Sequence, residues 1–151
     1  MDDLRELYQA TILGHNKKPR NFRVMEDASH EADGHNPLCG DELTMYAKVN
    51  DEGGLEEISF QGSGCAISKA SASLMTDHLK GKTLEEFQIE FDRFHELVTS
   101  SPGEEPNTEG LGKLAVFAGV REYPMRVKCA TLAWHALRAA LEDGGTTAKT
   151  E

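Results

Sequence analysis

The segment LTMYAKVNDEGGLEEISFQGSGCAISKASASLMTDH, residues 43–78, changes its hydrophobic period partway along and thereby decides the fold. Apolar and polar side chains alternate over residues 43–49, which predicts a half-buried strand. A turn rich in Asn, Asp and Gly occupies residues 50–54, and the alternation resumes over 57–61 in a returning strand. From residue 67 to 78 the apolar positions recur at helical spacing. This stretch therefore predicts a β-hairpin followed by a helix.

The residues before the hairpin predict one helix and one more strand. An amphipathic helix is expected over residues 3–13, and Pro19 stops it. Residues 29–35 alternate weakly, with Ala28, His30 and Ala32 spaced by two, and we interpret them as a strand.

The residues after residue 78 predict three further helices. Thr83 and Glu86 match a capping box that opens a helix through about Val98. A polar loop at 100–107 separates it from a shorter helix near 111–119. The last helix is expected from about residue 127 to residue 142.

Strands come first and helices later, which is typical of an α+β fold with helices packed on one face of a small sheet. The length suits one domain, and neither an internal repeat nor a linker interrupts it. We therefore expect a single domain over residues 1–143. The tail at 144–151, rich in Gly, Thr and Lys, is expected to be disordered.

The charge balance excludes two classes of partner. The 26 acidic and 16 basic residues give a formal charge of −10, which repels nucleic acid phosphates and anionic lipid. Such a surface can still dock onto a basic patch of another protein. No apolar run approaches the roughly 20 residues that span a bilayer, and the acidic start Met1-Asp2-Asp3 lacks the features of a signal peptide. A cytoplasmic location is the expectation.

The three cysteines are an odd number in a chain without an export signal, so a disulfide scaffold explains them poorly. Three buried, inert thiols are the alternative, because free cysteine is among the most buried residue types. The surroundings of each cysteine bear on the choice.

Cys39 precedes Gly40 and Asp41 in a tight turn before a strand, so its thiol is expected near the surface. Glycine between the two side chains lets both face one point. A turn whose aspartate makes only a local hydrogen bond is the competing interpretation.

Cys65 follows Gly62-Ser63-Gly64 between a strand and a helix. A cysteine at a helix N-terminus meets unpaired N–H groups and the helix dipole, which favour a thiolate. A glycine-rich loop can instead cradle phosphate, but this one lacks the lysine of a P-loop.

Cys129 is expected in the first turn of the last helix, with Arg126 and Lys128 close by in sequence. Positive charge there stabilises a thiolate, whereas core packing and a solvated basic face are the alternatives. Three thiolates and one carboxylate would complete a tetrahedral zinc site and disfavour magnesium and calcium. Because no Cys-x-x-Cys spacing occurs, the pattern leaves metal binding and core packing both open.

At these cysteines the sequence resembles the IscU/SufU family of iron–sulfur assembly proteins, and the SufU branch in particular. The resemblance extends to about residue 142 and rests on three motifs in the family's order: Gly34-His35-Asn36-Pro37-Leu38-Cys39-Gly40-Asp41, Gly62-Ser63-Gly64-Cys65-Ala66-Ile67-Ser68 and Pro124-Met125-Arg126-Val127-Lys128-Cys129-Ala130. IscU-type scaffolds have a histidine before the third cysteine, where Lys128 stands here. The long segment between the second and third cysteines also resembles SufU, and the chaperone-recognition motif of IscU is only partly retained.

The resemblance implies a small three-stranded antiparallel sheet with helices packed on it, and a metal site of Cys39, Asp41, Cys65 and Cys129. It implies zinc as the cofactor and sulfur acceptance from a SufS-type, pyridoxal-phosphate-dependent cysteine desulfurase as the activity. A histidine of the desulfurase would take the place on zinc that one ligand vacates. Downstream Suf scaffold proteins would be further partners.

Within that family we predict Cys39 as the sulfur acceptor, since it lies on a turn, and Arg126 as the cation that steadies the freed thiolate. Two alternatives stay open. The same ligands suit a scaffold on which a [2Fe–2S] cluster is assembled, and they suit a structural zinc module without sulfur chemistry.

Overall fold

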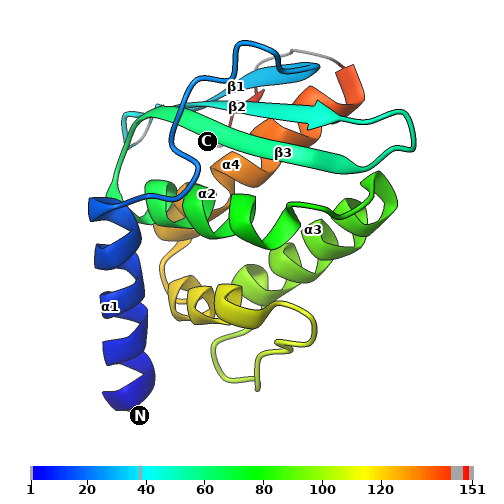
Figure 1. Ribbon diagram of the computed structural model, residues 1–151. Coiled ribbons are helices and arrows are strands. Elements are labelled where there is room, and N and C mark those ends of the chain that lie inside the picture. The colour runs from blue at the N-terminus through cyan, green and yellow to red at the C-terminus, as the bar shows by residue number, and fades with distance from the viewer. Residues whose placement is uncertain (1, 38, 144–147, 150–151) are drawn as a thin grey trace.

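The three predicted strands form one antiparallel sheet (Figure 1). The computed structural model describes residues 2–37, 39–143 and 148–149. β1 (His30–Asn36) pairs with β2 (Asp41–Val49), and β2 pairs with β3 (Leu55–Ser63) across the predicted turn. A two-residue strand, β4 (Ala148–Lys149), pairs in parallel with β1, which gives the order β3-β2-β1-β4. The α+β class and the three-stranded antiparallel sheet are confirmed.

Helices lie against one face of this sheet, here called its inner face. They are α1 (Asp2–Lys17), α2 (Ala66–Leu79), α3 (Leu84–Thr99), the 3₁₀ helix η1 (Gly112–Val120) and α4 (Pro124–Asp143). α4 packs beneath β1 and β2, and α2 packs beneath β3 and against α4. α3 and η1 form the next layer, and α1 stands beside α2 (Figure 1).

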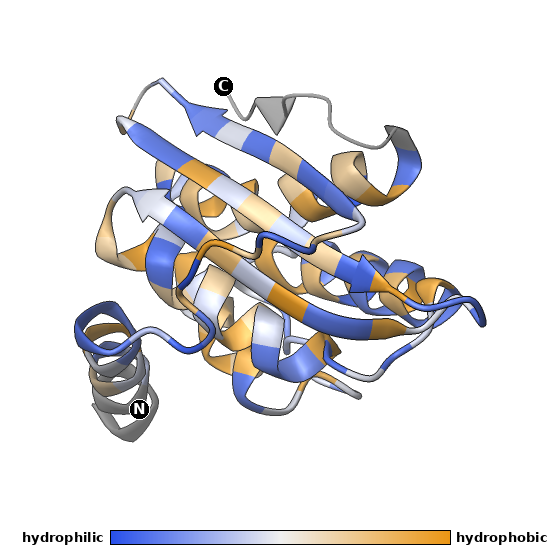
Figure 2. Cartoon of the chain, turned by 45° about the horizontal axis from the view of Figure 1, so that its top comes forward, coloured by the Kyte–Doolittle hydropathy of each residue, from blue (hydrophilic) through white to orange (hydrophobic). Residues whose placement is uncertain are grey.

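The alternation along the strands explains why one face of the sheet is buried (Figure 2). Leu43, Met45 and Ala47 of β2 point inward and are almost fully buried. Gly34 of β1 lets α4 approach closely, since a Cβ there would lie 3.0 Å from the Ala136 side chain. The inner face therefore holds α4 firmly, and α4 carries Cys129.

Aromatic rings bind α3 to α4. Phe94 stacks on Trp134 with ring centroids 4.6 Å apart, and Phe87 also lies parallel to Trp134. Both phenylalanines and the tryptophan are buried, as aromatic residues on the core-facing side of a helix usually are.

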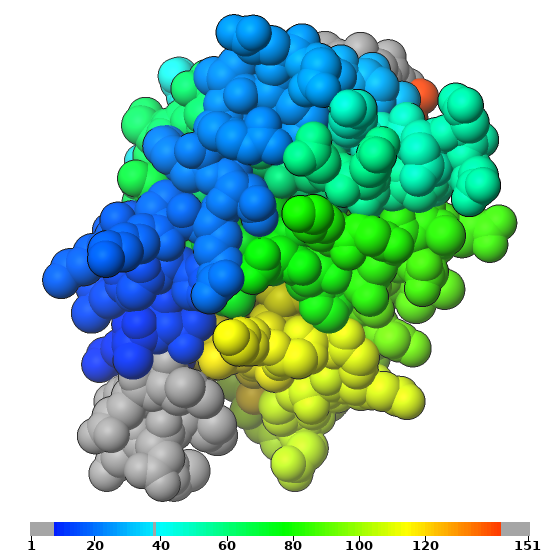
Figure 3. Space-filling view, in the orientation of Figure 1, coloured from blue at the N-terminus to red at the C-terminus, as the bar shows by residue number. Residues whose placement is uncertain are grey.

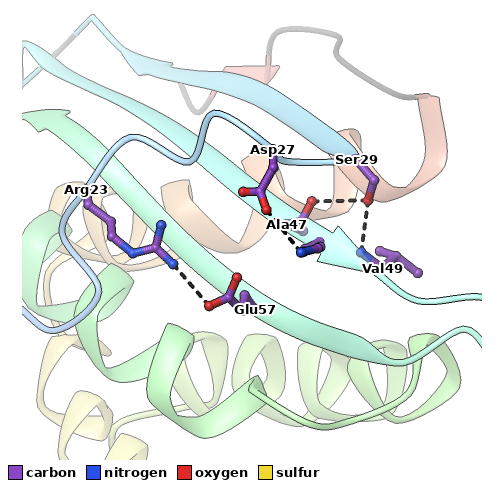
Figure 4. Close-up of polar contacts among 7 residues, drawn as sticks. Arg23, Asp27, Ser29, Ala47, Val49 and Glu57 are labelled. Carbon is purple, nitrogen blue, oxygen red and sulfur yellow. Dashed lines mark hydrogen bonds and ion pairs between the residues drawn. The ribbon is translucent and has the colours of Figure 1, made fainter.

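The segment 20–29, here called the strap, covers the outer face of the sheet. Its first residues pair with the free edge of β3, where the Arg23 amide donates to the Phe60 carbonyl at 2.8 Å. Its last residue reaches β2, because the Val49 amide donates to the Ser29 hydroxyl at 2.9 Å (Figure 4). The ion pair of Arg23 with Glu57 spans 3.4 Å (Figure 4). The strap runs over the surface between α1 and the hairpin (Figure 3).

The chain departs from the sequence-based boundaries at its C-terminal end. α4 begins at Pro124 and not near residue 127, so Cys129 lies in the second turn and the prediction of a first-turn cysteine is wrong. Of the tail predicted to be disordered, residues 144–147, 150 and 151 lie outside the described residues, while Ala148 and Lys149 are paired in β4. None of the helices in the described part of the chain has the length and apolarity that crossing a membrane requires.

Candidate metal centre

The three cysteines and Asp41 meet at one end of the inner face, although they come from distant parts of the chain. Cys39 lies in the turn between β1 and β2, and Asp41 is the first residue of β2. Cys65 is the N-cap of α2, and Cys129 approaches from α4. The fold therefore brings Cys39, Asp41 and Cys129 into one group and places Cys65 beside Asp41.

Two short distances define the centre. The Sγ atoms of Cys39 and Cys129 are 3.3 Å apart, and ligand atoms of these two residues and Asp41 all lie within 4.8 Å of one another. Cys65 is not part of this compact group, but its Sγ lies 3.9 Å from Asp41 Oδ2. Asp41 thus links the fourth predicted ligand to the other three.

Two glycines before Cys65 allow the chain to pass close to β2. A Cβ on Gly64 would lie 2.8 Å from Asp41 Oδ1. Gly62 has φ = +134°, and a Cβ there would lie 2.1 Å from the Glu42 carbonyl oxygen. Close approach to the strand accounts for this glycine-rich turn, so a phosphate is not needed to explain it.

Asp41 is fully buried and held by hydrogen bonds on both carboxylate oxygens. Its Oδ1 accepts the Cys65 amide at 2.7 Å, and its Oδ2 accepts the Ser68 hydroxyl at 2.7 Å. Both donors lie at the start of α2, 24 and 27 positions along the chain, so these bonds are not the local turn hydrogen bond that was the competing interpretation. Oδ1 keeps a further lone pair, so these bonds orient the carboxylate without preventing that oxygen from binding a cation.

Ser68 and Asn36 are parts of the centre that sequence reasoning missed. Ser68 is fully buried, and besides contacting Asp41 its amide donates to Cys65 Sγ at 3.5 Å. Asn36, the last residue of β1, is also fully buried and donates from Nδ2 to Cys129 Sγ at 3.7 Å. Both residues lie inside the motifs that carry the family resemblance, which is where a search for them would have begun.

The thiols are not equivalent. Hydrogen bonding from the Cys129 thiol, supported by the Ser68 amide and hydroxyl, lowers the pKa of Cys65 to about 6 despite burial. The same interaction with Cys65, followed by burial, raises the pKa of Cys129. Cys65 therefore ionises before Cys129. The dipole of α4 does not favour a Cys129 thiolate, because a helix dipole acts mainly within the first turn.

Arg126, in the first turn of α4, is exposed. Its guanidinium carbon is 4.4 Å from the centre of the Tyr123 ring, a cation–π arrangement. Tyr8 of α1 lies nearby; burial raises the pKa of its phenol, Arg126 opposes that shift, and Cys65 adds to it. α1 thus reaches the centre, which was not foreseen from the sequence.

The donor set fits a soft divalent cation. Thiolate sulfur suits zinc and iron–sulfur clusters, whereas magnesium and calcium require oxygen donors. Burial of Asp41 and Cys129 excludes water from one side of the centre, while Cys39 and Cys65 are half-buried. Two sulfur atoms and one carboxylate lie close enough together to share an ion, and Cys65, whose Sγ is 3.9 Å from Asp41 Oδ2, would supply the fourth ligand of a tetrahedral site.

Comparison with known proteins gives a consistent family assignment. The family model described as NifU-like N-terminal domain matches residues 7–130. The chain is 39% identical over 142 residues to the iron–sulfur cluster assembly scaffold protein IscU of Streptococcus pyogenes serotype M1, covering 94% of this chain and 87% of that one. It is 39% identical over 145 residues to the zinc-dependent sulfurtransferase SufU of Bacillus subtilis, covering 95% and 96%.

A solved structure shares the fold. It is the crystal structure of a protein named as an iron–sulfur cluster assembly scaffold for the SUF system, from Fervidobacterium islandicum AW-1. The match has a TM-score of 0.81 at 34% identity and covers 91% of this chain and 98% of that one. The chain therefore belongs to the family of NifU-like N-terminal domains, together with the IscU and SufU proteins of iron–sulfur cluster assembly.

Proposed function

We propose that this chain is a zinc-dependent sulfur acceptor of the SufU type, which takes persulfide sulfur from a cysteine desulfurase on Cys39. One observation carries the proposal: within the compact group, Cys39 lies in a half-buried turn, whereas Asp41 and Cys129 are buried in a strand and a helix. Cys39 can leave the ligand set without displacing a regular element. The relative named as a zinc-dependent sulfurtransferase supports the same activity.

Cys39, Asp41, Cys65 and Cys129 would hold the zinc ion. Bound zinc keeps cysteine sulfur deprotonated at neutral pH. Ser68 orients Asp41 by its hydrogen bond to Oδ2, so the carboxylate keeps its direction when Cys39 departs.

The transfer step is a thiol–persulfide exchange. The Cys39 thiolate attacks the terminal sulfur of the desulfurase persulfide, because thiolates are the nucleophiles in such reactions. A sulfur–sulfur bond forms on Cys39, the sulfur–sulfur bond of the desulfurase breaks, and the desulfurase cysteine leaves as a thiolate. No net oxidation occurs. Suf scaffold proteins would then receive the sulfur.

The decisive experiment is a desulfurase assay with this protein as the acceptor. Zinc-loaded protein should accept sulfur on Cys39, detected by mass spectrometry. Removing zinc should abolish acceptance, and restoring zinc should recover it. Cys39→Ala should fold and accept no sulfur; persulfide acceptance by folded Cys39→Ala would refute Cys39 as the acceptor. If the wild-type protein accepts no sulfur, the sulfur-acceptor proposal fails and a structural zinc module is the alternative.

Arg126 is proposed to steady the freed Cys39 thiolate. Arg126 is exposed and lies over the Tyr123 ring, and Tyr8 interacts with both Arg126 and Cys65, so the guanidinium is near enough for its charge to favour an anionic nucleophile. Arg126→Ala should slow sulfur transfer roughly tenfold, the effect of about 1.4 kcal/mol, while zinc stays bound. Arg20→Ala, at an exposed arginine that pairs with Asp77, is the control. Equal transfer rates in both variants would remove the role of Arg126.

The second candidate is a scaffold for a [2Fe–2S] cluster. The relatives named as IscU scaffolds favour it, and the donor set is compatible with it. Anaerobic purification followed by metal analysis separates the two. One tightly held zinc per chain supports the acceptor, and a labile brown cluster supports the scaffold.

A further inference from the structure

Asn36 contacts three of the four predicted ligands. Its Nδ2 lies 3.5 Å from Asp41 Oδ2 and 3.7 Å from Cys129 Sγ. Its backbone carbonyl accepts the Cys39 amide at 3.3 Å. Asn36 and Asp41 are also directly paired across β1 and β2, at the base of the turn that carries Cys39. One residue therefore joins the strand, the turn and α4: its side chain contacts Asp41 and Cys129, and its backbone contacts Cys39.

Chemistry fixes the direction of the Asn36 amide. Asn36 is fully buried, so each polar atom that lacks a partner costs free energy. The two N–H groups of Nδ2 are enough for one bond to Asp41 and one to Cys129. Turning the amide would place Oδ1 against a carboxylate and a sulfur. The observed orientation leaves Oδ1 without a hydrogen-bond partner among the described residues. In this orientation both N–H groups donate to the ligands, at the free-energy cost of one unpaired oxygen.

The hydrogen bonds of the Asn36 side chain affect Cys129 and Asp41 but not the sulfur of Cys39. A hydrogen bond to a metal-bound thiolate draws charge from the sulfur and lowers its nucleophilicity, and a hydrogen bond to the carboxylate fixes its orientation. Cys129 and Asp41 gain such a bond from Asn36. The contact of Asn36 with Cys39 is made through the backbone and holds the turn.

We infer that Asn36 is a positioning residue that retains Asp41 and Cys129 as fixed metal ligands and so leaves Cys39 as the ligand that exchanges. Metal retention by Asn36 does not depend on sulfur transfer, while the selection of Cys39 rests on the proposed function.

The test compares zinc-loaded Asn36→Leu with wild type. Leucine keeps the branched shape and the number of side-chain heavy atoms, although its methyl groups are bulkier, and it removes both donors. Two quantities are measured: the rate of zinc transfer to a chromogenic chelator, and the cysteine that iodoacetamide alkylates first, mapped by mass spectrometry. Wild type should be alkylated at Cys39. Asn36→Leu should release zinc 10- to 100-fold faster, the usual effect of losing an outer hydrogen-bond partner, and Cys129 should become alkylated too.

Asn50→Leu is the matched control. Asn50 accepts the Glu52 and Gly54 amides in the hairpin turn, far along β2 from the centre, so its loss should weaken the fold and leave zinc release unchanged. Equal acceleration in both variants would overturn the inference, as would less than a threefold effect of Asn36→Leu or alkylation that stays confined to Cys39.

A smaller change keeps the inference testable if Asn36→Leu does not fold. Asn36→Ser retains one hydroxyl donor and should release zinc at a rate between wild type and the expected leucine value. Release at the wild-type rate would overturn the inference. Because neither readout involves the desulfurase, failure here is distinct from failure of the proposed function, which depends on sulfur acceptance by Cys39.

Discussion

His135 of α4 lies in surroundings that oppose a positive charge. Its ring meets the edge of Phe91 with centroids 5.4 Å apart, and Arg138 and His95 lie close by. Burial is the main cause that lowers the pKa of His135 to about 4, and Arg138 and His95 add to it. The folded state therefore favours the neutral form of this ring.

The free energy of unfolding should fall as the pH drops from about 6.5 to about 4. The unfolded histidine has a pKa near 6.5, so in this window the unfolded chain binds a proton that the folded chain does not. Above about pH 6.5 the histidine is neutral in both the folded and the unfolded chain, so its protonation no longer lowers the free energy of unfolding. Urea titrations of metal-free protein at several pH values should show a shallower decline in His135→Gln than in wild type.

His30→Gln, at the start of β1, controls for loss of a histidine elsewhere. Metal-free protein is used because protons compete with zinc for the thiolates. Parallel pH curves for His135→Gln and wild type would contradict the expectation.

The single residues of the centre differ in how far sequence alone reveals them. Cys39, Asp41 and Cys65 could be singled out because turn residues and glycines mark their positions. Asn36 could not, because its partner Cys129 is 93 positions away and only the packing of α4 on β1 joins them. Which cysteines form the compact group likewise depends on that packing.

Among the elements, α3 begins with a complete capping box. The Thr83 hydroxyl accepts the Glu86 amide at 3.1 Å, and the Glu86 carboxylate accepts the Thr83 amide at 2.9 Å. These bonds satisfy two backbone donors that a helix N-terminus otherwise leaves free.

Thr83→Ala should destabilise the protein by about 1 kcal/mol, the usual cost of losing an N-cap side chain. Chemical denaturation measures it. Thr83→Ser keeps the hydroxyl and should remain within a few tenths of a kcal/mol of wild type. Zinc content should not change in either variant, because α3 contributes no ligand. A negligible effect of Thr83→Ala would show that packing alone sets the start of α3.

The elements that sequence predicts best are those with a clear hydrophobic periodicity, such as the hairpin, or with a local start signal, such as the capping box of α3. α4 was placed three residues late because its first turn is exposed and adds nothing to the apolar stripe; Met125 is 53% exposed. Pro124 at the first helical position was the available signal, since proline is favoured there. The sequence does not predict that β4 pairs with β1, because a strand of two residues is too short to show an alternating hydrophobic pattern.

At the scale of the whole molecule, the centre joins the β1–β2 turn, α2 and α4. A metal that binds only the folded chain stabilises it by mass action, by about 2.7 kcal/mol at a free concentration one hundred times Kd. Thermal unfolding with zinc and after chelation should therefore show a lower Tm without zinc. Magnesium should not restore the Tm, because its oxygen preference does not match three sulfurs.

Cys129→Ala supplies the internal comparison, since it should lose most of the difference in Tm between the zinc-loaded and chelated states. A Tm that is the same with and without zinc in wild type would contradict binding at these residues. A Tm difference retained by Cys129→Ala would place the metal elsewhere.

The strap has a consequence for how copies of this protein behave at high concentration. A β-strand at the margin of a sheet offers unpaired amides and carbonyls to any neighbouring chain, which is a common beginning of fibril growth. Here Asn21 and Arg23 already occupy both backbone groups of Phe60, and Phe22 lies against the Phe60 ring. The chain thus covers the β3 margin at Phe60 itself, so the backbone groups of that residue are not available to a second polypeptide.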